Sequence, residues 1–79
     1  MLEQKLFFNN LEEIKEFVNI ANTKDYDIEL ISTKYVVNAK SIMGVFSLDL
    51  TKPVLMRAHC DKNGELIKQI VPFICKQGN

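Results

Sequence analysis

The chain has 79 residues, an apolar content of 47%, and ten basic against ten acidic residues. This length allows a single domain, over residues 1–79, and the apolar content argues against disorder. Because the net charge is zero and no basic block exists, nucleic acid is not an expected partner. No apolar run approaches the ~20 residues that span a bilayer, and the residues after Met1 do not form the apolar core of a signal peptide. We therefore expect a cytoplasmic protein that does not bind membranes.

The N-terminal part predicts a strand followed by a capped helix. The strand covers Glu3–Phe8, which alternates in the way a half-buried strand does. Asn9 or Asn10 then caps the helix, and Glu12 or Glu13 completes a capping box. The apolar residues of the helix recur at helical spacing and form one stripe, which consists of Leu11, Ile14, Phe17, Val18 and Ala21.

Alternating residues after the helix predict a hairpin. The helix ends near Asn22, where polar residues take over. A second strand is predicted over Tyr26–Ile31, and Ser32–Lys34 is short enough to turn the chain into a third strand at Tyr35–Val37.

The segment from Ser41 to Leu48 predicts a short helix with two apolar sides. Ser41 is a favourable N-cap because its hydroxyl can accept a hydrogen bond from a backbone N–H of the first turn. At about 100° per residue, Ile42, Met43 and Phe46 fall on one side. A helix this short buries one side, so we expect these three residues to form an exposed docking patch beside Ser41. Burial of both sides in the core is the alternative.

The C-terminal part predicts a strand, a turn and a helix. The strand covers Val54–Cys60, with Val54, Met56 and Ala58 facing the core and Leu55, Arg57 and His59 facing away. A turn follows at Asp61–Gly64. The helix covers Glu65–Val71 and ends before Pro72, which has no N–H to donate. Its apolar face consists of Leu66, Ile67, Ile70 and Val71.

The order strand–helix–strand–strand–helix–strand–helix predicts an α+β fold. Helices with one apolar stripe must cover a surface, and the alternating strands offer one face. We therefore expect a four-stranded antiparallel sheet with three helices on one face and a mostly solvated opposite face. The pattern also fits a ferredoxin-like sandwich with an extra helix.

One run of residues resembles a known family. The run Asn38-Ala39-Lys40-Ser41-Ile42-Met43-Gly44-Val45, followed by Ser47-Leu48, closely resembles the segment around the regulatory serine of HPr, the phosphocarrier family of the bacterial sugar phosphotransferase system. Phe17–Asn22 resembles the family's first helix, and the resemblance extends loosely over nearly the whole chain. It selects the HPr-like open-faced β-sandwich over the ferredoxin-like alternative.

The family's phosphocarrier motif, Gly-Leu-His-Ala-Arg-Pro, has no counterpart between Phe7 and Ile14. Without gaps, Asn10 and Glu12 stand where the family has its histidine and arginine. An amide is a poor nucleophile and a carboxylate repels phosphate, so neither residue can replace them. The single histidine, His59, falls late in the fourth predicted strand, away from the first helix. The resemblance therefore implies a divergent member that has lost histidine phosphocarrier activity.

Ser41 matches the family's regulatory serine. In the family, a serine kinase/phosphorylase modifies this residue, and the product can bind a LacI-type transcription regulator. The resemblance thus implies a protein of carbon catabolite regulation that is phosphorylated at Ser41. A phosphate there adds about −1.5 to −2 charge at a helix start. The implied partner-binding patch consists of Lys40, Ile42, Met43 and Phe46.

Other functions remain open at this point. Ser41 can be a helix cap alone, in a structural HPr-fold domain that is a monomer or a weak homodimer. Such a domain would self-associate through Phe7, Ile31 and Leu55 on the open sheet face. A small-molecule sensor is less favoured, because the chain has no Gly-rich phosphate loop.

Catalytic and metal chemistry are not expected. No nucleophile–base pair stands out, so we expect no enzyme and no cofactor. His59, Cys60 and Cys75 do not have the number and spacing of metal ligands. A disulfide between the two cysteines is not expected in a cytoplasmic chain.

Overall fold

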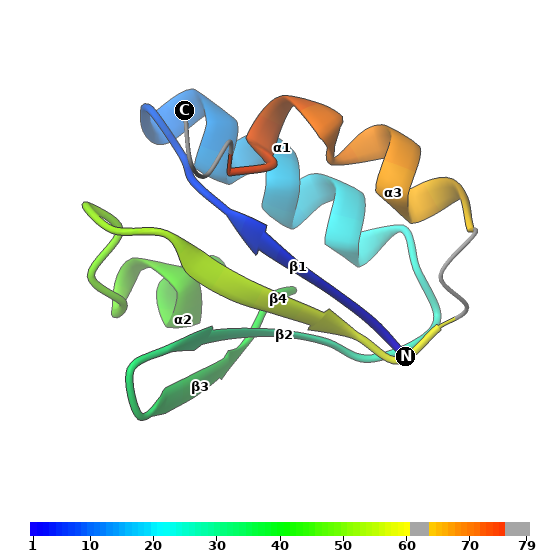
Figure 1. The fold of residues 1–79 in the computed structure, drawn as a ribbon, viewed down its shortest axis with the longest axis horizontal. Helices are drawn as coiled ribbons and strands as arrows, with labels where there is room; N and C mark the ends of the chain where they lie inside the picture. The colour runs from blue at the N-terminus through cyan, green and yellow to red at the C-terminus, as the bar shows by residue number, and fades with distance from the viewer. Residues whose placement is uncertain (61–63, 76–79) are drawn as a thin grey trace.

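The computed structural model describes residues 1–60 and 64–75, in which an antiparallel sheet of four strands is covered by helices (Figure 1). The strand order is β1-β4-β2-β3. In chain order the elements are β1 (Leu2–Leu6), α1 (Leu11–Asn22), β2 (Ile28–Ser32), β3 (Tyr35–Asn38), α2 (Ile42–Phe46), β4 (Val54–Ala58), α3 (Glu65–Gln69) and the 3-10 turn η1 (Val71–Phe73). The predicted α+β architecture is confirmed.

The hydrophobic core lies between the sheet and the helices. Strand alternation turns every second strand residue toward the helices, and each helix contributes apolar side chains to the same core. Helix α2 contacts both β3 and α1. The largest fully buried side chains are Phe17, Leu6, Ile28, Leu30, Met56, Leu66, Ile70, Val45 and Val54. Within residues 1–60 and 64–75, no helix lies on the opposite face of the sheet (Figure 1).

Strand β1 ends at Leu6, two residues before its predicted end, and at this point the chain also pairs with the C-terminal segment. Phe7 N–H donates to the Phe73 carbonyl at 2.8 Å, and Cys75 N–H donates to the Lys5 carbonyl at 3.0 Å. The C-terminal segment thereby pairs with the outer edge of β1 at its end, around Leu6, and β3 forms the other edge of the sheet.

Two residues that helical spacing assigned to the core are exposed. Leu11 opens the first turn of α1 with 48% of its surface exposed, and Val71 is 56% exposed. Helix α3 ends at Gln69, and the chain continues as the tighter η1 around Pro72. Because η1 has three residues per turn, the spacing that places Ile70 in the core no longer applies to Val71.

Strands β2 and β4 are also shorter than predicted. β2 begins at Ile28, after Tyr26, and β4 ends at Ala58, before Cys60. The predicted turn at Asp61–Gly64 has its first three residues outside the described residues.

The hairpin between β2 and β3 is confirmed. Ser32 pairs with Tyr35, so the turn consists of Thr33 and Lys34. Thr33 has a φ of 54°, in the left-handed region that β-branched residues rarely adopt.

Candidate functional site

Ser41 is the N-cap of α2, as its sequence context predicted. Its backbone is extended, with φ −104° and ψ 112°, and its Oγ accepts a hydrogen bond from Gly44 N–H at 3.1 Å. Its carbonyl accepts the first helical bond from Val45 N–H at 3.0 Å. The residue is nevertheless exposed. Ser41 therefore has a structural role and is also accessible at the surface.

The residues before Ser41 are held by contacts from two elements. Asn38 Oδ1 accepts from Lys40 N–H at 2.9 Å and closes a tight turn. The Lys40 Nζ donates to the carbonyl of Lys24, just after α1, at 2.8 Å. Asn22 Nδ2 donates to the Lys40 carbonyl at 3.0 Å. The Lys40 ammonium therefore interacts with the end of α1. The role of Asn22 was missed from the sequence, because nothing in the local pattern signals a contact between residues so far apart.

The two apolar sides of α2 lie in different environments. Val45 belongs to the core, whereas Met43 is 76% exposed and Phe46 is 44% exposed. Ile42 is half-buried and packs against the core. With Lys15 and Lys40, it borders a groove of about 350 Å³ between α1 and α2. The structure thus brings Met43 and Phe46 to the surface on the same short helix that Ser41 caps.

The start of α1 is closed by hydrogen bonds similar to a capping box, except that Glu13 bonds to Asn9, the residue before the N-cap Asn10. Asn10 Oδ1 accepts from Glu13 N–H at 3.0 Å. Glu13 Oε1 in turn accepts from Asn9 N–H at 2.8 Å and from Asn9 Nδ2 at 3.2 Å. A carboxylate therefore lies at the helix N-terminus, the position that would otherwise favour a bound anion.

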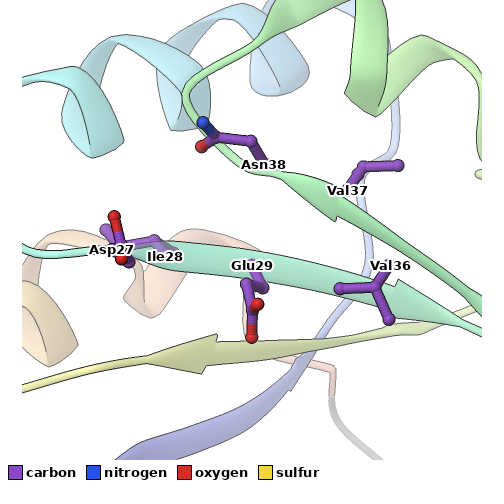
Figure 2. A pocket seen from close by; sticks show the side chains of 6 residues that line it. All are labelled: Asp27, Ile28, Glu29, Val36, Val37 and Asn38. Atoms are coloured by element: carbon purple, nitrogen blue, oxygen red, sulfur yellow. The ribbon is translucent and has the colours of Figure 1, made fainter.

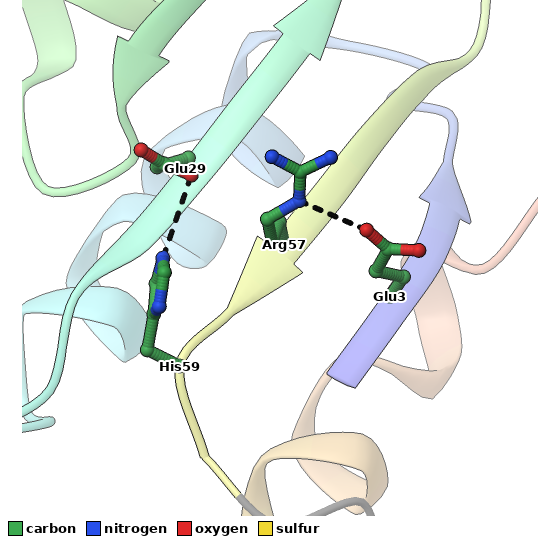
Figure 3. A network of polar contacts seen from close by, with 4 residues as sticks. All are labelled: Glu3, Glu29, Arg57 and His59. Carbon is green, nitrogen blue, oxygen red and sulfur yellow. Dashed lines mark hydrogen bonds and ion pairs between the residues drawn. The ribbon is translucent and has the colours of Figure 1, made fainter. Parts of the chain in front are cut away.

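His59 lies on the helix-free face of the sheet, not at the start of α1. Its Nε2 is 3.5 Å from Glu29 Oε1, and beside it Arg57 Nε donates to Glu3 Oε2 at 2.9 Å (Figure 3). The structure therefore does not combine His59 with a helix N-terminus.

A second surface depression lies between β2 and β3, with a volume of about 220 Å³ (Figure 2). It is lined by Asp27, Ile28, Glu29, Val36, Val37 and Asn38. Val36 and Val37 point to opposite sides of β3, as strand alternation requires. None of the described residues that line this depression is a lysine or arginine, and Asp27 and Glu29 are acidic, so these residues are poorly suited to an anionic ligand.

In the part of the chain that the structure describes, the remaining polar side chains do not provide the ligand set that a metal ion needs. Among residues 1–60 and 64–75, no group of three His, Cys, Asp or Glu side chains is placed to hold a metal. Cys60 is a free thiol, so it does not pair with Cys75. Burial and a hydrogen bond with Cys60 raise the pKa of Tyr26 to about 12. In the same described part of the chain, no helix has the length and apolar character to cross a membrane.

The fold defines a small open-faced β-sandwich whose second helix begins at an exposed serine. The family described as PTS-HPr, the PTS HPr component phosphorylation site, matches residues 12–74. The chain is also similar to HPr-C-His from Thermoanaerobacter tengcongensis, known from its crystal structure. The identity is 30%, the TM-score is 0.74, and the match covers 94% of this chain and 91% of that chain. No curated protein matches the sequence.

This chain therefore belongs to the HPr family of the phosphotransferase system. The matched range begins inside α1, after the junction at which the sequence lacks the family's histidine motif.

Proposed function

We propose that this HPr-family protein is a regulatory interaction protein that is phosphorylated at Ser41 and does not carry phosphate on histidine. The observation that carries the proposal is the position of Ser41 at the surface, on a helix that also exposes Met43 and Phe46. A modified hydroxyl and an apolar contact are thus available to one partner. In this role the chain catalyses no reaction, needs no cofactor and acts in the cytoplasm with other phosphotransferase proteins.

Loss of the carrier reaction is supported by the chemistry at the start of α1. A phosphoryl group carried there would need a nucleophile and positive charge, but Asn10 caps the helix and Glu13 brings a carboxylate. We expect no acid-labile phosphohistidine after incubation with the general phosphotransferase enzyme and phosphoenolpyruvate. A histidine-containing HPr is the positive control. Labelling that disappears in His59→Ala would contradict this part of the proposal.

Phosphorylation of Ser41 would act mainly as a surface charge. Helix α2 has only 5 residues, so its dipole contributes modestly. Because the Lys40 ammonium is bonded to the Lys24 carbonyl, the phosphate stays available to a cation of the partner. The partner we propose is a LacI-type transcription regulator, as the resemblance to the family implies.

The kinase reaction tests the site directly. Incubation with an HPr-type serine kinase/phosphorylase and ATP should add one phosphate, detected by intact-mass spectrometry. Ser41→Ala should abolish the addition. Ser47→Ala, at the exposed C-cap of the same helix, is the matched control and should leave it unchanged. Failure of the wild-type chain to accept phosphate, or its acceptance by Ser41→Ala, would refute the proposal.

Binding to the regulator tests the apolar part of the patch. Met43→Ala and Phe46→Ala should each weaken binding of the phosphorylated protein by about tenfold, the equivalent of about 1.4 kcal/mol. Val71→Ala removes an exposed apolar side chain from a different surface and should leave the affinity unchanged. Equal effects of all three substitutions would exclude α2 as the docking surface.

A further inference from the structure

The helix-free face of the sheet carries its side chains in rows that run across the strands. One row is apolar on three of its four strands and consists of Lys5, Leu55, Ile31 and Val36. The next row is polar and consists of Glu3, Arg57, Glu29 and Asn38. A third row is defined by the hydrogen bond from His59 N–H to the Asp27 carbonyl, 2.9 Å long.

In every row, the residue at β4 complements the residue at β2. Leu55 and Ile31 are both apolar and half-buried. Arg57 is opposite in charge to Glu29. At the end of the two strands, a histidine lies across from an aspartate. If a second copy of this face is turned over so that its β4 lies on β2, each β4 side chain therefore meets a complementary β2 side chain. An isologous interface requires this self-complementarity.

We propose that this face binds a second copy of the chain, with a two-fold axis parallel to the strands and midway between β4 and β2. This two-fold rotation places β4 of one copy on β2 of the other. Each row of one copy then meets the same row of the other copy, with the order of the strands reversed. Leu55 then meets the partner's Ile31, and Arg57 meets the partner's Glu29.

The outer strands fit the same arrangement. Lys5 faces the partner's Val36, so the aliphatic stem of the lysine covers an apolar side chain that is 56% exposed in the single chain. Glu3 faces the partner's Asn38, which can donate a hydrogen bond to a carboxylate. No row brings two like charges together.

Arg57 has donors for a second carboxylate. Its Nε donates to Glu3, and Figure 3 shows both terminal nitrogens directed away from that contact. A guanidinium has five N–H donors, so binding the partner's Glu29 does not require it to leave Glu3.

The size of the face predicts a weak dimer. Four strands spaced about 4.8 Å apart, each about five residues long at about 3.3 Å per residue, span a flat area of about 300 Å². A stable interface of standard size buries about 800 Å² per partner. The zero net charge of the chain favours association, but the small area makes the dimer depend on concentration.

Charge-reversed variants test the pairing in trans. Sedimentation velocity should show dimer growing with concentration in the wild-type protein. In a dimer of Glu29→Arg, the new arginine of each copy meets Arg57 of the other copy. In a dimer of Arg57→Glu, the new glutamate of each copy meets Glu29 of the other copy. Because like charges then repel at both symmetric contacts, each variant alone should be monomeric. An equimolar mixture of the two should recover the dimer, because the reversed charges then face each other between copies. Glu16→Arg, on the exposed surface of α1, is the charge-matched control and should dimerise like the wild type.

A measurement on the wild-type protein tests the same interface without any substitution, so it does not depend on whether the variants fold. Dilution of the wild-type protein should shift the amide resonances of residues 29–31 and 55–57, and leave those of α1 and α3 unchanged. A wild-type monomer at ~1 mM, a dimer that persists in both single variants, or a mixture of folded variants that stays monomeric would overturn the proposal. None of these outcomes depends on whether Ser41 is phosphorylated.

Discussion

Asn22 and Lys40 join α1 to the segment that precedes α2. The Asn22 Nδ2 donates to the Lys40 carbonyl at 3.0 Å and to the Val18 carbonyl, within its own helix, at 2.9 Å. Lys40 makes a second hydrogen bond to this region through its ammonium, which donates to the carbonyl of Lys24, just after α1. The position of Ser41 therefore depends on α1 as well as on the short helix that Ser41 caps.

Asn22→Ala should lower the free energy of unfolding by about 1–2 kcal/mol, because it removes two hydrogen bonds and leaves the Lys40 carbonyl with one partner fewer. Urea denaturation measures the change. Asn19→Ala is the matched control, since Asn19 is exposed on the same helix, and it should stay within about 0.5 kcal/mol of the wild type. If the two variants were equally stable, the link from Asn22 to Lys40 would not hold the segment before Ser41.

Ser41→Ala should cost about 1 kcal/mol of stability through loss of the cap on Gly44 N–H. Ser41→Asp should recover most of this loss, because a carboxylate oxygen can accept the same bond. Thermal melting of the three proteins gives the comparison. A melting temperature of Ser41→Ala equal to that of the wild type would mean that Ser41 is not needed as a cap, and that its hydroxyl is available solely for modification.

The parts of the fold that local chemistry determines could be predicted from the sequence. Asn10 and Glu13 lie three residues apart, and the hydrogen bonds that they make at the start of α1 involve only neighbouring residues, so they need no information from elsewhere in the chain. The two-residue period of β4 likewise places Met56 in the core and Arg57 on the open face, because alternation is a property of the strand itself.

The parts that depend on distant contacts could not be predicted. Val71 was assigned to the core by extending a helical period past Gln69, but the chain tightens there into a 3-10 turn. The ammonium of Lys40 bonds to the carbonyl of Lys24, 16 residues away, a contact that the sequence did not indicate, and the place of Lys40 in the partner-binding patch stays a prediction. Sequence spacing gives no measure of such a contact.

Thr33→Gly should stabilise the protein by about 1 kcal/mol. Thr33 has a φ of 54° in the hairpin turn, a conformation that costs an L-residue roughly 1–2 kcal/mol and glycine almost nothing. Lys34→Gly is the control at the neighbouring position, where φ is not positive. It should destabilise the protein, because glycine there only adds freedom to the unfolded chain. Equal effects of the two substitutions would show that the Thr33 backbone is not strained.

Tyr26 should make stability depend on pH in alkaline solution. Burial, helped by the hydrogen bond with Cys60, raises the pKa of Tyr26 from 10.0 to about 12, so the folded state favours the neutral phenol. When the pKa of a group is higher in the folded state than in the unfolded state, the group contributes its full stabilisation at pH values below the unfolded pKa. The contribution of Tyr26 is therefore complete below pH 10.0 and is lost as the pH rises to about 12.

Tyr26→Phe removes this titration and isolates its effect from that of the other alkaline groups. Chemical denaturation at a series of pH values should show the wild type more stable by a constant amount below about pH 10, the pKa of tyrosine in an unfolded chain. Above that pH the difference in free energy of unfolding should shrink, because the Tyr26 phenol ionises less readily in the folded chain than in the unfolded chain. Tyr35→Phe, at an exposed side chain, controls for removal of a phenol. A difference between wild type and Tyr26→Phe that stayed constant through the alkaline range would mean that folding does not perturb the Tyr26 hydroxyl.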